Sequence, residues 1–259
     1  MLRSLNAFFV RVGLFGALLF LGACGGGGSG SSDDNNESSV TPAPRAGVYE
    51  GVATNGNGDS TVESLLFLSP TGRYLTSVGG GFIAGNITFK VDGTLTATGR
   101  AFLSGGSGVS ADLPTTGTVT SAEAMILKTE SDGTSLTFDF KRDNDASDIG
   151  VTLDAIAAQG TYMMNDGVNP VITFTVDSNG DLTGNDGSPC TFKGALTVPN
   201  PAVNIILVDF TASGCKSGAE PDPRNGQYEG TGIFIPDDVG GMLVFGAAAK
   251  NVAVRFVGE

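Results

Sequence analysis

The side chains best suited to chemistry in this sequence are three cysteines and two loops rich in carboxylates. The chain has no histidine, which excludes imidazole bases, imidazole metal ligands and the common Ser–His and Cys–His catalytic pairs. Thiol modification, disulfide formation and cation binding by oxygen remain. We therefore expect no catalytic residues and no cofactor, although a hydrolase that uses a pair of carboxylates is left open by composition.

Both acidic loops contain oxygen ligands of the kind that a cation requires. Asp143, Asp145 and Asp148 lie in one loop between the two halves of the chain, where a solvated acidic linker is the preferred alternative. The segment DSNGDL (177–182) begins like a calcium loop, but leucine stands where such a loop needs glycine at its sixth position. A hairpin turn is the simpler interpretation of this segment. We predict no metal site, and the first loop is the better of the two candidates.

The N-terminal segment has the features of a secretory signal. Arg3 and Arg11 precede the apolar run LFGALLFL (14–21), and small residues follow it. This run is shorter than the ~20 apolar residues that a helix needs to cross a bilayer. The segment therefore predicts export and cleavage.

The first cysteine stands directly after this signal. The stretch LGAC (21–24) resembles the bacterial lipobox, whose cysteine becomes the lipidated first residue of the mature chain. The resemblance implies a signal peptide over residues 1–23, a lipid on Cys24 and, with Gly25 next to it, sorting to the outer membrane of the bacterial envelope. An ordinary signal with a chance cysteine is the alternative.

Residues 24–45 are expected to form a flexible tether. They are rich in glycine, serine and acidic residues and contain nothing to bury. The whole chain has a formal charge of −13, and removal of a signal that contains arginines and no acidic residue makes it more negative. An acidic surface repels phosphate groups, so nucleic acid is excluded as a partner and the membrane is contacted through the lipid.

The other two cysteines are predicted to pair. Cys190 and Cys215 flank the runs TFKGALTV (191–198) and VNIILVDFT (203–211), which are joined by Pro199-Asn200-Pro201 and read as a hairpin. This hairpin brings residue 190 level with about residue 213, and a bulge or turn at 213–214 absorbs the offset. Exported proteins keep such disulfides. Two separate buried thiols are the alternative.

A short motif recurs at the start of predicted strands. GVYEG (47–51) returns as GQYEG (226–230), and GTY (160–162) lies between them. The recurring residues are Gly47 and Tyr49, Gly160 and Tyr162, and Gly226 and Tyr228. We expect the glycines at strand starts, the rings buried, and Tyr228 on the sixth strand of its half.

Short β-branched and aromatic runs alternate with glycine turns from residue 47 onward, and helical periodicity is scarce. Strands and hairpins match in order between residues 46–146 and 147–259, which indicates duplication. The fold class predicted is all-β: two homologous antiparallel halves, each a closed or open barrel of about seven or eight strands. One larger barrel or a sandwich is the alternative. Leu153, Ile156 and Ala157 are spaced for one helical turn that caps a barrel end.

Two resemblances add to this interpretation. The Gly-x-Tyr opening is similar to the Gly-x-Trp opening of lipocalin-type barrels, which implies that an arginine of the last strand covers the ring; Arg255 is the candidate in the second half. The runs SLTFDFKR (135–142), TLDAIAAQGTY (152–162) and VDFTASGC (208–215) resemble a large group of bacterial lipoproteins that has no assigned activity. That resemblance implies the lipid anchor, duplicated halves and the disulfide.

The function expected from these features is that of a lipid-anchored, non-catalytic binding or interaction module. A protein, a glycan and a small apolar molecule are the ligand classes left open. The alternative is a structural or adhesive surface spacer without a ligand pocket.

Overall fold

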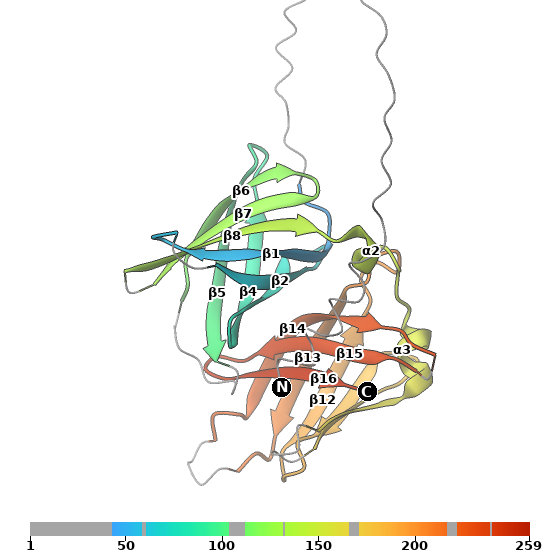
Figure 1. Cartoon of the computed structure of the whole chain (residues 1–259). Coiled ribbons are helices and arrows are strands. Elements are labelled where there is room, and N and C mark those ends of the chain that lie inside the picture. Colours follow the sequence, from blue (N-terminus) through green and yellow to red (C-terminus); the bar gives the residue numbers. More distant parts are fainter. Residues whose placement is uncertain are drawn as a thin grey trace, which may run out of the picture. The chain divides into compact units, whose positions relative to one another are not determined.

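The structure is a computed structural model of the whole chain (Figure 1). The structure describes residues 43–58, 61–103, 112–131, 133–165, 171–216, 222–238 and 240–259. β-Strands form most of this part of the chain, and each half curls into its own barrel-like sheet. The all-β prediction with two antiparallel halves is confirmed, and the alternative of one larger barrel or sandwich is not adopted.

The first half is a closed, eight-stranded antiparallel barrel. Its strands are β1 (Gly47–Asn55), β2 (Thr61–Leu68), β3 (Arg73–Val78), β4 (Gly81–Phe89), β5 (Thr94–Leu103), β6 (Thr115–Ser121), β7 (Ala124–Ser131) and β8 (Thr134–Arg142). Each strand pairs with its neighbour in sequence, and β1 also pairs with β8. Tyr49 therefore lies between Leu66 of β2 and Arg142 of β8.

The second half is an eight-stranded antiparallel sheet that is nearly closed. Its strands are β9 (Thr161–Met164), β10 (Ile172–Val176), β11 (Asp181–Asn185), β12 (Thr191–Thr197), β13 (Ile206–Ser213), β14 (Gly226–Ile235), β15 (Met242–Ala248) and β16 (Ala253–Gly258). The first and last of these strands meet where Met163 and Glu259 exchange backbone hydrogen bonds of 2.8 and 3.3 Å. Such an exchange is the hydrogen-bonded pair of an antiparallel ladder.

The predicted turns have the backbone geometry that glycine permits. Gly72, Gly93 and Gly180 follow Thr71, Asp92 and Asn179, and their φ angles are 86°, 81° and 83°. Positive φ costs glycine little because it has no Cβ. These turns fix which strands become neighbours, so local sequence sets most of the pairing order.

Two short helices connect the halves. They are α2 (Asn144–Ser147) and α3 (Leu153–Gln159), and the predicted boundary between residues 146 and 147 falls within α2. The predicted helical turn is part of α3, whose Ile156 is fully buried in the core of the second half. This contact places α3 against the second barrel, as Figure 1 also shows.

Side chains fill the interior of each barrel. The first core contains aliphatic residues with Tyr49, Tyr74, Phe138 and Phe140. The second is more aromatic: the ring of Phe174 lies 5.0 to 5.4 Å from the rings of four other phenylalanines. Aromatic rings at such distances pack favourably edge to face or offset. Both interiors are therefore occupied by packed side chains.

A third apolar core joins the barrels into one compact unit. The first barrel contributes Leu75 of β3 and the stacked rings of Phe82 and Phe102, 5.4 Å apart, from the β4–β5 hairpin. The second contributes Ile205 and Ile233 among others. Burying these side chains stabilises the pair of barrels at roughly 25 cal/mol per Å² of apolar surface.

Buried polar groups complete this junction. The backbone NH of Asn204 donates to the Ser147 carbonyl at 2.7 Å, and the Asn204 side-chain oxygen accepts from Phe234 NH at 3.1 Å. The Ser147 hydroxyl in turn accepts from Val48 NH at 2.9 Å. Buried polar groups are costly unless paired, so these bonds fix the position of α2 between β1 and β14.

Candidate functional site

One tyrosine corner occurs twice in the molecule. Tyr49 is buried on β1 and its hydroxyl donates to the carbonyl of Arg45; Tyr228 is buried on β14 and its hydroxyl donates to the carbonyl of Arg224. In both cases the arginine precedes the tyrosine by four residues. A tyrosine that bonds to the backbone just upstream fixes the entry of the chain into a strand.

The glycine of each corner has the same backbone geometry. Gly47 and Gly226 begin their strands with φ angles of 151° and 149°. L-residues rarely adopt this region, so the shared Arg-x-Gly-x-Tyr-Glu-Gly pattern has a physical reason at its glycine. The prediction from sequence used only the Gly-x-Tyr motif and did not include the arginine two residues before the glycine, although both copies contain this arginine.

The third tyrosine of the motif is held differently. Tyr162 is fully buried on β9, its hydroxyl donates to the Ile156 carbonyl of α3 at 2.7 Å, and its ring lies edge-on to Phe234. Gly160 is the C-cap of α3, with a φ of 75°. Burial raises the pKa of both Tyr162 and Tyr228 to about 12. These hydroxyls remain protonated hydrogen-bond donors at physiological pH.

In the first half, an arginine lies beside the tyrosine of the Gly-x-Tyr motif. The prediction for Arg255 is wrong: its side chain is exposed on β16, because it falls on the outward-facing set of an alternating strand. Arg142, on the last strand of the first barrel, is fully buried beside Tyr49. Its guanidinium donates to the Ala46 carbonyl at 3.0 Å and to Asp148 at 2.6 Å.

The acidic loop between the halves is accounted for by structural contacts. Asp143 is the N-cap of α2 and accepts from Ala146 NH at 3.0 Å, and Asp148 pairs with Arg142 and Arg45. Asp145 is exposed in the first turn of the helix. The loop therefore caps a helix and neutralises a buried arginine.

The calcium-like segment is a hairpin turn. One oxygen of Asp177 accepts from the backbone NH groups of Asn179 and Asp181 at 2.8 and 2.9 Å. Side-chain acceptors of this kind stabilise tight turns. Among the described residues, no three His, Cys, Asp or Glu side chains come together as a group that could hold a metal ion.

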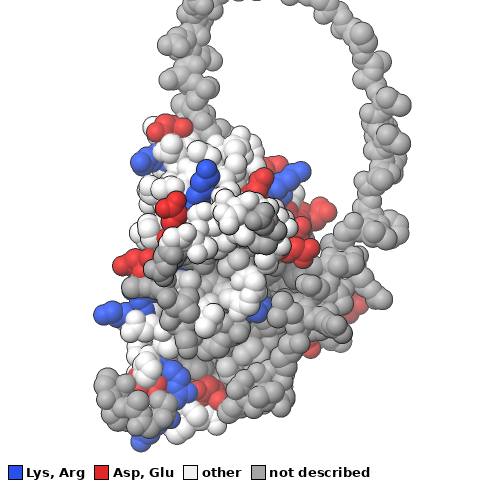
Figure 2. Space-filling view, turned by 60° about the vertical axis from the view of Figure 1, so that its left-hand side comes forward, with Lys and Arg blue, Asp and Glu red and all other residues white. Residues whose placement is uncertain are grey.

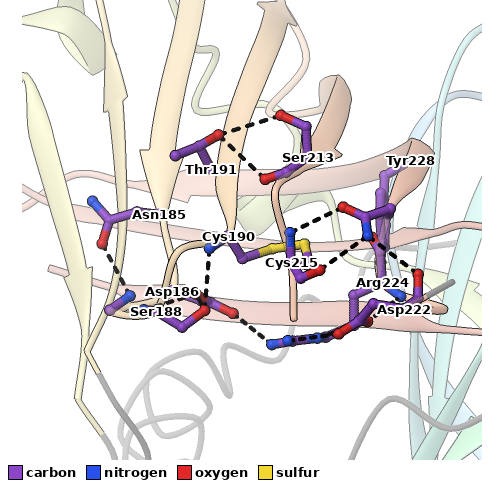
Figure 3. The surroundings of a disulfide bond; sticks show 12 residues. Asn185, Asp186, Ser188, Cys190, Thr191, Ser213, Cys215, Asp222, Arg224 and Tyr228 are labelled. Carbon is purple, nitrogen blue, oxygen red and sulfur yellow. Dashed lines mark hydrogen bonds and ion pairs between the residues drawn. A yellow bond between two sulfur atoms is a disulfide. The ribbon is translucent and has the colours of Figure 1, made fainter. Parts of the chain in front are cut away.

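Cys190 and Cys215 form a disulfide, as predicted, with their Cα atoms 3.9 Å apart (Figure 3). Strands β12 and β13 pair Thr191 with Ser213, and Gly214 makes the predicted turn with a φ of 72°. The bond therefore closes the open end of this hairpin. Both cysteines are buried.

A polar network surrounds this disulfide (Figure 3). Asn225 accepts from Cys215 NH at 3.0 Å and donates to the Cys215 carbonyl at 3.1 Å. Arg224 pairs with the buried Asp222 at 3.0 Å and with Asp186 at 2.9 Å. The sequence analysis did not identify these three charged residues, which connect the second tyrosine corner to the disulfide hairpin.

Besides a hollow of approximately 450 Å³ over β5, β6 and β7 of the first barrel, the surface has a groove of approximately 220 Å³ where β3, β4 and β5 meet β14 and β15. It is open because many lining residues are small: Ala84, Gly85, Gly99, Gly230, Ala248 and Ala249. Gly85 and Gly99 face each other across β4 and β5, and a Cβ on Gly85 would lie 1.9 Å from the Thr98 carbonyl oxygen. Only glycine fits this close approach.

Two arginines line this inter-barrel groove. Arg73 is fixed, because it donates to Asp209 at 2.7 Å and to the Gly230 carbonyl at 3.0 Å, both on the second barrel. Arg100 is held more loosely: its nitrogens lie 3.5 Å from the Asn251 side-chain oxygen and 4.0 Å from Asp112.

On the face shown in Figure 2, Lys and Arg lie among Asp and Glu, so described charges of both signs are interspersed there.

Cys24 and most of the predicted tether lie outside the described residues. In the part of the chain that the structure describes, no helix is long and apolar enough to cross a membrane.

Searches against protein-family models, curated proteins and solved structures found no match to this chain.

Proposed function

We propose that this protein is a lipid-anchored lipoprotein of the bacterial envelope that binds a ligand or partner without transforming it. The lipobox-like LGAC stretch supports the anchor, and the acidic chain favours contact with the membrane through the lipid alone. Sorting to the outer membrane is part of the proposal and rests on Gly25 after Cys24.

The observation that carries the binding function is the position of the open space. Both barrel interiors are packed with side chains, whereas the groove between the barrels is open and lined by arginines from β3 and β5. An apolar ligand inside a barrel would have to displace buried rings, which costs several kcal/mol. A polar ligand on the outer surface requires no such displacement.

The anchor is tested by labelling. Wild-type protein is expected to incorporate labelled palmitate and to fractionate with the outer membrane, and Cys24→Ala to remain an unlabelled precursor. Cys24 is the only cysteine outside the disulfide pair, so the variant leaves the folded domain intact. Normal labelling of Cys24→Ala would contradict the proposed anchor.

Native mass spectrometry of the full-length protein, purified from the envelope of its own host, tests the binding function. A retained small molecule or a specific partner is expected. Its repeated absence, from protein that is folded and lipidated, would favour the structural spacer.

A further inference from the structure

The inter-barrel groove has the chemistry of a site for a single acidic sugar. We propose that it binds one sugar ring that carries a carboxylate, and that Arg100 receives this carboxylate. The inference rests on the proposed binding function and names the ligand class.

Arg100 has the capacity to bind an oxyanion. Its side chain is only 25% exposed, yet its contacts with Asn251 and Asp112 are as long as 3.5 and 4.0 Å. A guanidinium presents five N–H donors in a planar fork that matches a carboxylate. A partly desolvated cation with long contacts gains from a bidentate carboxylate, which makes shorter, charge-assisted bonds. Ala84 lies directly opposite Arg100 on β4 and leaves the space for it.

The charges that line the groove favour a singly charged anion over a doubly charged one. Arg73 is already paired with Asp209, so it does not offer a second anion site. Glu229 and Asp112 line the same groove, with side chains 68% and 92% exposed. These carboxylates repel a doubly charged phosphate and accept hydrogen bonds from hydroxyl groups. A ligand with one carboxylate and several hydroxyls satisfies both requirements.

The size and polarity of the groove favour one sugar ring. Its approximately 220 Å³ is below the ~300 Å³ at which sites for drug-sized ligands begin. Asn86 and Thr98 face each other across β4 and β5, are both exposed, and line the groove next to Arg100. An amide and a hydroxyl each donate and accept, as sugar hydroxyls require.

The experiment is saturation-transfer NMR on the full-length lipidated protein in detergent micelles. The probes are glucuronate and galacturonate, with glucose, galactose and inorganic phosphate as comparisons. At least one sugar acid is expected to bind saturably and at least about tenfold more tightly than its neutral counterpart, since hydrogen bonds to charged groups typically provide that difference. Binding of neither sugar acid, or equal binding of phosphate, would overturn the proposal.

Variants assign the binding to Arg100. Arg100→Gln is expected to lose about tenfold or more in affinity, whereas Arg255→Gln, an exposed arginine on β16, is expected to bind like wild type. Thr98→Glu places an anion beside Arg100 at an exposed position and tests the same site if Arg100→Gln does not fold. Wild-type affinity in a folded Arg100→Gln or Thr98→Glu variant would refute the assignment. Retention of a different ligand from the host would refute the sugar acid alone and leave the binding function standing.

Discussion

At the scale of single residues, the molecule depends on buried side chains that carry one polar group each. Tyr49, Tyr162 and Tyr228 bury their rings and direct their hydroxyls to backbone carbonyls upstream. The ring supplies apolar burial, and the hydroxyl satisfies a carbonyl where the chain enters the barrel. These tyrosines therefore serve stability.

The two contributions of a corner tyrosine can be separated by substitution. Tyr49→Phe removes the hydroxyl bond to Arg45 and is expected to reduce the free energy of unfolding by about 1 kcal/mol. Tyr49→Ala also removes the fully buried ring and is expected to cost about 3–5 kcal/mol. Urea unfolding at neutral pH measures both. Wild-type stability of Tyr49→Ala would make this tyrosine a surface feature, contrary to its burial.

The pair of Arg142 and Asp148 makes stability depend on pH. The Arg142 guanidinium lowers the pKa of the Asp148 carboxyl below its usual value. A lowered folded-state pKa gives stability that is present above the unfolded pKa of ~3.9 and is lost as pH falls through the folded value. Because the Asp148 side chain is 40% exposed and the pair is screened by solvent, Asp148→Asn is expected to cost about 1 kcal/mol or less at pH 7 and progressively less below about pH 4.

Urea unfolding of wild type and variant at several pH values measures this effect. Asp145→Asn is the matched control, because Asp145 is an exposed acidic residue of the same loop. An equal loss in both variants, or a loss for Asp148→Asn that does not change with pH, would show that the ion pair is not responsible.

At the scale of elements, the features that nearby residues determine were predictable from the sequence. The features that depend on the register between distant strands were not. Turns at Gly72, Gly93 and Gly180, the β12–β13 hairpin and helix α3 follow from nearby residues. The residue that lies beside Tyr49 depends on the register in which the last strand of the barrel pairs with the first, and no local sequence pattern specifies this register. Arg142 therefore lies beside Tyr49 in the first half, whereas Arg255, the candidate in the second half, is exposed. The groove could not be predicted from the sequence either, because most of the residues that line it come from five strands of two barrels.

The disulfide hairpin is expected to contribute substantially to stability. The bond joins residues 25 apart in sequence, for which the chain-entropy model gives about 3.5 kcal/mol. The double variant Cys190→Ala with Cys215→Ala should unfold at correspondingly lower urea concentration. A reductant should lower the stability of wild type and leave the variant unchanged. An unchanged midpoint for the variant would mean that the network around Asn225 holds the hairpin without the bond.

At the scale of the whole molecule, the two barrels are expected to unfold as one unit. They share the apolar core formed by Leu75, Phe82 and Phe102 with Ile205 and Ile233, and Arg73 bonds across the same junction. Elements that share a buried core lose it together, so wild type should show a single calorimetric transition whose calorimetric and van't Hoff enthalpies agree. Two transitions in wild type would contradict this coupling.

The coupling can be removed without disturbing either interior. Phe82→Ala with Phe102→Ala deletes the stacked rings of the shared core, and each large-to-small change costs about 3–5 kcal/mol. If the junction provides the coupling, this double variant should split the transition into two. Phe138→Leu, inside the first barrel, should instead lower a single transition, because it weakens one barrel and leaves the junction intact. The groove lies on this junction, so the uncoupled variant should also lose any ligand that requires both walls.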